Sequence, residues 1–196
     1  MSLADVRARP VSVRAGSMRE GLRAATEEVH LALHRAAPFA AIADGTITRE
    51  TYADTLDFLY RYHGALAGWC AAGARTLGLD TLALVHQARL AALRADLAVF
   101  GRVVPHVEEE PAEAGAFAAG VLYTVQGSTL GGKVIWRQLD GLLDGEGGRS
   151  FFKGSPEDGH HWRLLCAALE QQSDGAGMEA GARHAFARFA AMLASG

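Results

Sequence analysis

Apolar residues recur at intervals of three and four along almost the whole chain after residue 16, which is the spacing of amphipathic helices. Ser17 and Glu20 have the spacing of a capping box, so a first helix is expected to begin there. Its apolar stripe consists of Leu22, Ala25, Val29, Leu33 and Ala36. Pro38 is expected to end this helix, because the residue before a proline disfavours helical geometry.

The same spacing predicts further helices. Residues 38–47 read as a loop, and Thr48 can cap a second helix. A third helix is expected over 82–100, followed by a connection over 101–111. The fourth helix is predicted from about residue 112 to 143.

The last third of the chain carries two more helix starts. Ser155, Pro156 and Asp158 are typical of an N-cap, a first-turn proline and an acidic third position. A final helix is expected from about Met178. No segment shows the alternation of a strand, so the prediction is one all-α domain over 17–196, preceded by a flexible arm over 1–16.

Three glycines interrupt the fourth predicted helix, between Tyr123 and Ile135. Gly127, Gly131 and Gly132 each cost a helix interior about 1 kcal/mol relative to alanine. That total is large beside a typical folding stability of about 5–15 kcal/mol. Close packing of two helices, a kink or a flat ligand lying against the bare backbone would each explain them.

Composition narrows the classes of function. The chain has 196 residues, 49% of them hydrophobic, with a net charge of −3 and a pI near 6.2. An acidic protein of this kind gives no reason to expect a nucleic acid as partner. Cys70 and Cys166 lack zinc-site spacing and are consistent with a reducing cytoplasm. No apolar run approaches the ~20 residues that cross a membrane.

His30 is the first candidate for chemistry. It lies beside the apolar stripe of the first helix, with Thr26 one turn before it. A neutral imidazole there can pack in the core, donate a hydrogen bond or bind a metal. His34, one turn later, reads as a solvated or capping histidine.

A di-iron carboxylate site is an alternative metal centre. Such sites need two Glu-x-x-His pairs on helices together with further glutamates. Glu27–His30 supplies one pair, and Glu157–His160 has the spacing of a second. No evident helix supplies the remaining glutamates.

Taken together, these segments resemble the heme oxygenase family. The sequence Leu22 to His30 is similar to the family's proximal helix, in which a histidine four residues after a threonine binds the iron. Gly127-Ser128-Thr129-Leu130-Gly131-Gly132 matches the distal pattern Gly-x-x-x-Gly-Gly. The resemblance extends from residue 17 to about 170 and includes Phe151-Phe152 and Trp162-Arg163.

The resemblance implies a set of site residues. His30 would bind the heme iron, with Thr26 in the same motif, and Gly127, Gly131 and Gly132 would let the distal helix approach the porphyrin. Arg23, Arg163 and Tyr123 would meet the heme propionates, since arginine pairs well with carboxylate. Ser128 stands where many members have an aspartate that organises water, and Gln126 is a nearby polar substitute.

The implied function is a monooxygenase that opens heme, its substrate and cofactor, to biliverdin, carbon monoxide and ferrous iron. Ferredoxin or a reductase would supply electrons, because no flavin or nicotinamide motif is visible. Lys133, Arg137 and Lys153 could dock the donor. The distal motif is most similar to members associated with bacterial phytochromes, so a bilin-binding phytochrome is an expected partner. A non-catalytic heme carrier or sensor, or a heme-free relative such as a thiamin-type hydrolase or a di-iron oxidase, stays open.

Overall fold

The computed structural model describes residues 17–143 and 147–194, and within these ranges it contains helices and loops but no strand. The predicted all-α class is confirmed. The expected arm over 1–16 lies outside the described residues. The helices are α1 Met18–His34, α2 Phe39–Ala43, α3 Arg49–Ala65, α4 Ala67–Thr76, α5 Thr81–Val99, α6 Ala116–Gly127, α7 Thr129–Gln138, the 3-10 helix η1 Leu139–Gly141, α8 Ser150–Lys153, α9 Asp158–Leu169 and α10 Gly175–Ala194.

Two predicted helix starts are confirmed by their caps. Ser17 Oγ accepts from the amide of Glu20 at 3.2 Å, and the Glu20 carboxylate accepts from the Ser17 amide at 3.0 Å. Thr48 Oγ1 accepts from the Thr51 amide at 3.1 Å. Each side chain satisfies an amide that the first helical turn leaves without a partner.

The caps predicted for α9 are present, and only the helix boundary differs. The Ser155 hydroxyl accepts from the Glu157 amide at 3.1 Å, and the Asp158 carboxylate accepts from the Ser155 amide at 2.8 Å. Ser155 and Asp158 therefore bond as the two ends of a capping box do. Residues 156 and 157 form a turn, so the regular helix α9 begins at Asp158.

Three other boundaries differ as well. The predicted loop 38–47 contains the short helix α2, and the second predicted helix divides into α3 and α4 at Leu66. The fourth predicted helix starts later, at Ala116, and divides at Ser128 into α6 and α7. A change of direction between Gly127 and Thr129 agrees with the tendency of helices to kink at glycine and serine pairs.

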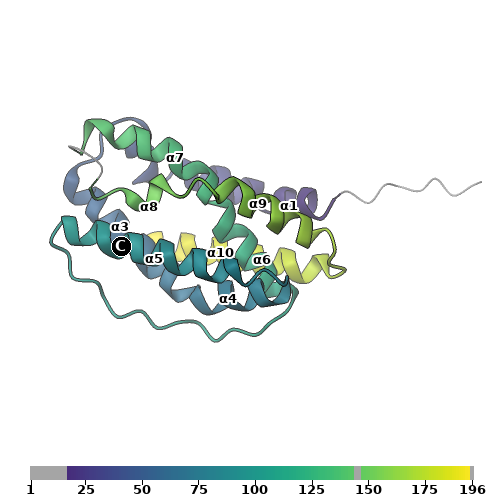
Figure 1. The fold of residues 1–196 in the computed structure, drawn as a ribbon. Helices are drawn as coiled ribbons and strands as arrows, with labels where there is room; N and C mark the ends of the chain where they lie inside the picture. The colour runs from purple at the N-terminus through teal and green to yellow at the C-terminus, as the bar shows by residue number, and fades with distance from the viewer. Residues whose placement is uncertain (1–16, 144–146, 195–196) are drawn as a thin grey trace, which may run out of the picture.

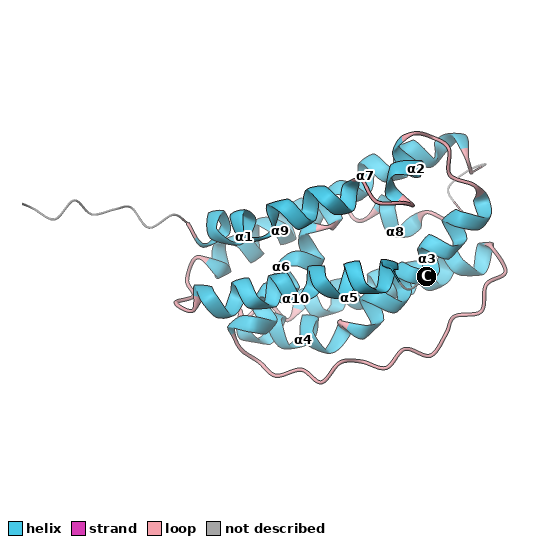
Figure 2. Cartoon of the chain, turned by 180° about the vertical axis from the view of Figure 1, so that it is seen from behind, coloured by secondary structure: helices cyan, strands magenta, loops and turns pink. Residues whose placement is uncertain are grey.

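The helices form two layers (Figures 1 and 2). One layer holds α1, α7 and α9, and the other holds α3, α4, α5 and α10. Helix α6 runs between the layers and packs against α4 and α10. Eight of its twelve residues are buried, so α6 is the central helix from which α7 extends.

The core has two clusters of buried apolar side chains. One surrounds α6 and includes Leu66, Leu122 and Leu165; the other lies toward α8 and includes Tyr52 and Phe152. Tyr52 is fully buried, and its hydroxyl donates to the carbonyl of Gly148 at 2.8 Å. The two clusters support α6 and α7 respectively, so both halves of the glycine segment rest on packed core.

The segment 101–115, here called the strap, returns the chain from α5 to α6 along the outside of the molecule (Figures 1 and 2). Glu110 attaches it. The Glu110 amide donates to the Ala65 carbonyl at 2.9 Å, and its carboxylate accepts from Trp69, His184 and Arg188 at 3.2, 2.8 and 2.5 Å. The strap is thereby tied to α3, α4 and α10.

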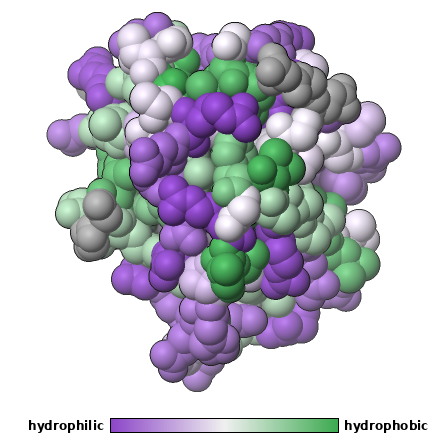
Figure 3. Space-filling view, turned by 90° about the vertical axis from the view of Figure 1, so that its left-hand side faces the viewer, coloured by the Kyte–Doolittle hydropathy of each residue, from purple (hydrophilic) through white to green (hydrophobic). Residues whose placement is uncertain are grey.

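The surface is mostly polar at the end of the molecule seen in Figure 3, where hydrophobic residues show between hydrophilic ones. None of the helices in the described ranges has both the length and the apolar character that crossing a bilayer requires.

Candidate site between α1 and α7

The helices α2, α8, α9 and α10 frame the region between α1 and α7. Both α2 and α9 contact α1 as well as α7. The main partner of α1 is α10, and the main partner of α7 is α8. Glu170, which follows α9, accepts from the amides of Met18 and Arg19 at 2.9 and 3.1 Å. A carboxylate at the N-terminus of a helix is favoured by the helix dipole, so this contact anchors α1 to α9.

Helix α1 presents a polar flank on which His30 lies. His30 is exposed, and its ring centroid is 6.0 Å from that of Phe186 on α10. A histidine fully packed in the core is therefore excluded. Arg19 and Arg23 lie on the same side of α1, because residues 4, 7 and 11 positions apart on a helix share a face.

Thr26 lies one helical turn before His30 on the same side of α1. It is buried, and its hydroxyl donates to the carbonyl of Leu22 at 2.8 Å. This bond lies within α1 and orients no other helix. The side chain of His34 lies outside the described part of the structure.

The three glycines of the distal segment have three different surroundings. Gly131 has open space where a side chain would lie, and its neighbours Leu130 and Val134 are 48% and 55% exposed. Gly132 instead faces α8: an added Cβ would lie 2.9 Å from the carbonyl oxygen of Phe152. Gly131 therefore fits the explanation of a flat ligand, and Gly132 fits close packing.

Gly127 is covered by an aromatic ring. An added Cβ at Gly127 would lie 3.4 Å from the Cη2 atom of Trp162 on α9. Trp162 in turn packs against Tyr123, with ring centroids 5.3 Å apart and an interplanar angle of 36°. The sequence contained Trp162 but gave no sign that it lies on Gly127, because the contact joins two separate helices.

Ser128 and Gln126 differ sharply in exposure. Ser128 is exposed, and its hydroxyl donates to the carbonyl of Val125 at 2.7 Å. Gln126 is only 4% exposed, and its amide nitrogen has no hydrogen-bond partner among the described residues. Ser128 is thus accessible at the helix break, whereas Gln126 lies in the core.

Charged groups gather where α1, α6 and α9 meet. Burial raises the pKa of Tyr123, and the proximity of Cys166 raises it further, while Arg19 and Arg23 act in the opposite direction. Both guanidinium groups are therefore near the phenol. Arg23 is exposed and lies 3.6 Å from Glu27, and Arg163 is exposed on α9.

Arg19 was missed by reasoning from the sequence. Its side chain acts on both Tyr123 and Cys166, so it lies between α1 and α9. A signal was present, because Arg19 stands one helical turn before Arg23. The structure thus brings the expected Arg23 and Tyr123 together and adds Arg19 beside them.

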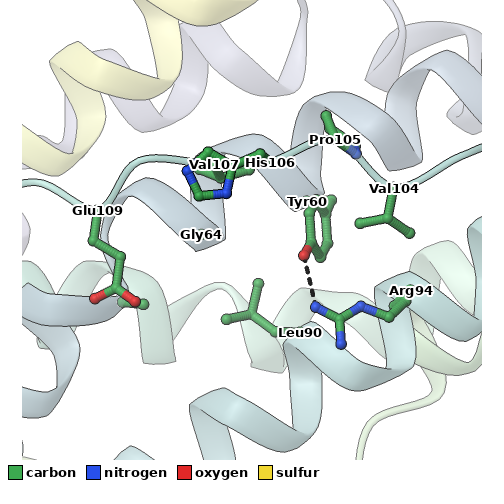
Figure 4. Close-up of a pocket in the computed structure, with 10 residues that line it drawn as sticks. Tyr60, Gly64, Leu90, Arg94, Val104, Pro105, His106, Val107 and Glu109 are labelled. Carbon is green, nitrogen blue, oxygen red and sulfur yellow. Dashed lines mark hydrogen bonds between the residues drawn. The ribbon is translucent and has the colours of Figure 1, made fainter.

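Two cavities lie elsewhere. One of about 570 Å³ is bounded by α3, α5 and the strap (Figure 4), where Arg94 donates to the Tyr60 hydroxyl at 2.9 Å. The other, of about 350 Å³, lies between α1 and Arg183 of α10 and is lined by Ala25 and Val29. Neither is lined by His30 or by a distal glycine, so neither is the candidate site.

The di-iron alternative has no site in residues 17–143 and 147–194. In these ranges no group of three or more histidine, cysteine, aspartate or glutamate side chains is arranged to hold a metal ion. Glu157 and His160 flank the turn at the start of α9, and the Glu157 side chain bonds with Ser155. The second Glu-x-x-His pair therefore does not meet the first.

Comparison with known proteins gives a consistent result. Residues 17–195 match the family model described as heme oxygenase. A heme oxygenase of Xanthomonas campestris pv. campestris (strain 8004) is 35% identical over 165 residues, which cover 79% of this chain and 96% of that protein.

Two solved structures have the same architecture. The NO- and CO-bound heme oxygenase from Neisseria meningitidis superposes with a TM-score of 0.71 at 27% identity, covering 92% of both chains. The heme oxygenase from Leptospira interrogans has a TM-score of 0.71 at 19% identity, covering 91% of this chain and 99% of that one, and supports the fold.

Proposed function

The chain belongs to the heme oxygenase family, and from this premise we propose that it opens heme to biliverdin, carbon monoxide and ferrous iron between α1 and α7. Heme supplies the iron at which dioxygen is activated, and electrons come from an external donor. The observation that carries the proposal is that an exposed histidine on α1 and open backbone at Gly131 on α7 lie on two helices that share α2 and α9 as neighbours.

His30 is the proposed iron ligand. Its imidazole is exposed on a helix that is held by α9 at one end and by α2 at the other. A neutral imidazole offers one nitrogen to a metal while the other donates a hydrogen bond. Because α1 rests on α10 along its buried face, the ligand is carried by a rigid element.

Gly131 and its neighbours form the proposed opposing surface. Leu130 and Val134 leave apolar area exposed to water, and Gly131 adds no side chain between them. A planar macrocycle placed there would remove this area from water, at about 25 cal/mol for each Å² of apolar surface. Gly127 and Gly132 contribute differently, by accommodating Trp162 and α8.

Arg23, Arg163 and Tyr123 are proposed to receive the propionates. Arg23 is exposed, and its partner Glu27 is exposed as well, so this pair can separate at little cost. Guanidinium groups form bidentate bonds with carboxylates. The phenol of Tyr123 remains protonated near neutral pH, because its pKa is raised, and so it can donate a hydrogen bond.

Ser128 is proposed to organise water near the reacting edge. Its hydroxyl proton is directed to the Val125 carbonyl, so its oxygen remains an acceptor for a water molecule. A hydroxyl carries no charge and is a weaker anchor than a carboxylate. Bulk water would then supply protons through the exposed helix break.

The electron donor is proposed to be a ferredoxin or a reductase. Lys133 and Arg137 are exposed on α7, and Lys153 is exposed on α8 with its ammonium 6.0 Å from the Trp136 ring. These cations lie on the elements that carry the distal segment and would attract an acidic partner. A bilin-binding phytochrome is the proposed recipient of the product, and the cytoplasm the proposed location.

Hemin titration tests the binding site. Wild-type protein is expected to give a Soret band, and His30→Ala to shift or abolish it. His106→Ala, which removes an exposed histidine of the strap, is the matched control and should bind as the wild type does. An unchanged Soret band in His30→Ala would contradict the assignment of the ligand.

Turnover tests the reaction. Reductant and air should replace the Soret band with a bilin spectrum and release carbon monoxide. A carrier or sensor is the second candidate, favoured by the uncharged Ser128 at the reacting edge. In that case the bound heme would survive the same treatment.

A further inference from the structure

We propose that Trp162 is a positioning residue: its indole closes the α6 end of the site and sets how the porphyrin lies in its own plane, and hence which meso carbon is opened. The inference rests on the proposed function of the same site. It concerns the identity of the product rather than the occurrence of the reaction.

The first step is the position of the indole. Its Cη2 and Cζ3 atoms lie 3.4 and 3.5 Å from where a Cβ of Gly127 would be, which is ordinary van der Waals contact. The bare backbone of Gly127 is therefore already occupied by a ring from α9. A planar ligand on α7 cannot also cover Gly127 while Trp162 stays in place.

The second step is the support behind the ring. Tyr123 lies one helical turn before Gly127 and packs against Trp162 at 5.3 Å between centroids. Trp162 is half-buried and contacts the core cluster around α6. Aromatic pairs of this kind stabilise one ring orientation, so the indole forms a fixed wall instead of a mobile side chain.

The third step is the change in surroundings one turn later. Gly131 has nothing within 4 Å of a built Cβ, and Val134 beyond it is 55% exposed. The open apolar surface thus begins where the indole ends. A porphyrin on this surface would meet Trp162 with one of its edges.

An edge contact decides in-plane orientation. The four meso carbons of a porphyrin lie at four corners of a near-square plate, and a rotation by a quarter turn exchanges them. Propionate contacts with Arg23 or Arg163 would restrict this rotation at the end of the site where α1, α6 and α9 meet. The indole lies at the same end and would restrict the rotation further, since substituents differ in size along each edge.

Two Trp162 variants test the product. Wild type is expected to yield one predominant biliverdin isomer by chromatography, and Trp162→Ala a mixture, with hemin affinity lowered by no more than about tenfold. Trp162→Phe restores a ring and should restore the single isomer. Trp69→Phe on α4 is the matched control, because the Trp69 indole lies away from the candidate site, where it donates to Glu110 of the strap.

A spectroscopic measurement makes the test independent of turnover. Protein labelled with 5-fluorotryptophan has three resonances, one for each tryptophan, and Trp162→Phe identifies its own. Zinc protoporphyrin IX should shift the Trp162 resonance by its ring current and leave Trp69 nearly unchanged.

The outcomes separate the two proposals. A hemin-binding protein whose Trp162 resonance does not move, or whose Trp162→Ala variant gives the wild-type isomer pattern, would overturn the role of Trp162 and leave the proposed function standing. A mixed product from the wild type would also overturn it. A chain without any Soret band on hemin addition would overturn the proposed function, and this inference with it.

Discussion

Gly120 of α6 and Gly181 of α10 lie in reciprocal contact with the backbone of the opposite helix. A Cβ added at Gly120 would overlap the carbonyl oxygen of Met178, and one added at Gly181 would overlap that of Phe117. Two helices can approach this closely only without side chains at the crossing. Helix α6, from which the distal segment continues, is therefore positioned by glycines outside the recognised motif.

Alanine at either crossing glycine is expected to destabilise the protein by about 3 kcal/mol or more, because backbone atoms cannot move aside as a flexible side chain can. Urea unfolding of Gly120→Ala and Gly181→Ala measures the change. Gly159→Ala is the control, since a built Cβ there meets nothing within 4 Å. A loss below about 1 kcal/mol in both variants would contradict a tight crossing.

Gly131→Ala is expected to have opposite effects on stability and on binding. Without ligand, alanine is favoured over glycine in a helix interior by about 1 kcal/mol, and the added Cβ lies in open space. The free protein should therefore unfold at higher urea. Hemin affinity should fall, because the methyl group stands where the ligand would lie. Undiminished affinity would remove Gly131 from the site.

The buried histidine pair predicts a loss of stability in acid. Burial lowers the pKa of His63 well below 6.5 and that of His86 to about 4. Two smaller effects act on His86: the hydrogen bond between its Nε2 and the His63 carbonyl at 3.0 Å raises the pKa, and the nearby Arg89 lowers it. Between about pH 6.5 and 4 the unfolded chain binds more protons than the folded one, so the free energy of unfolding falls as the pH falls.

The expected slope is about 1.4 kcal/mol for each pH unit and each histidine. Urea unfolding between pH 7 and 5 measures it. His86→Gln keeps a hydrogen-bonding side chain and lacks the titration, so its slope should be smaller. Equal slopes in the two proteins would show that His86 takes up no proton on unfolding.

Glu110→Gln is expected to loosen the strap. Burial raises the pKa of this carboxyl, but hydrogen bonds from His184 and Arg188 outweigh burial and bring the pKa below its ordinary value. Replacing the charge weakens these bonds, each worth about 1.5–3 kcal/mol when a charged group takes part. The variant should unfold at lower urea and be cleaved faster in the strap by a protease.

Glu109→Gln provides the comparison for this variant, because Glu109 is an exposed neighbour on the same strap. It should behave as the wild type in both measurements. If the two variants are cleaved at the same rate, the Glu110 carboxylate does not hold the strap.

Local features were readable from the chain. The caps at Ser17 and Thr48 depend on side chains that bond within three residues, and the helical period depends on neighbours one turn away. The motifs around His30 and Gly131 are also short and contiguous. These interactions are nearly complete within a single segment, so the helices and the family could be inferred before any packing was known.

Contacts between segments could not be read in this way. Three glycines of one motif have three different neighbours: Trp162 beside Gly127, open space at Gly131 and α8 beside Gly132. The role of Arg19 likewise depends on where α9 lies. The type of a residue limits which contacts it can make. Which residue lies next to it depends on how helices far apart in sequence pack together, because close packing depends on all the side chains of the core.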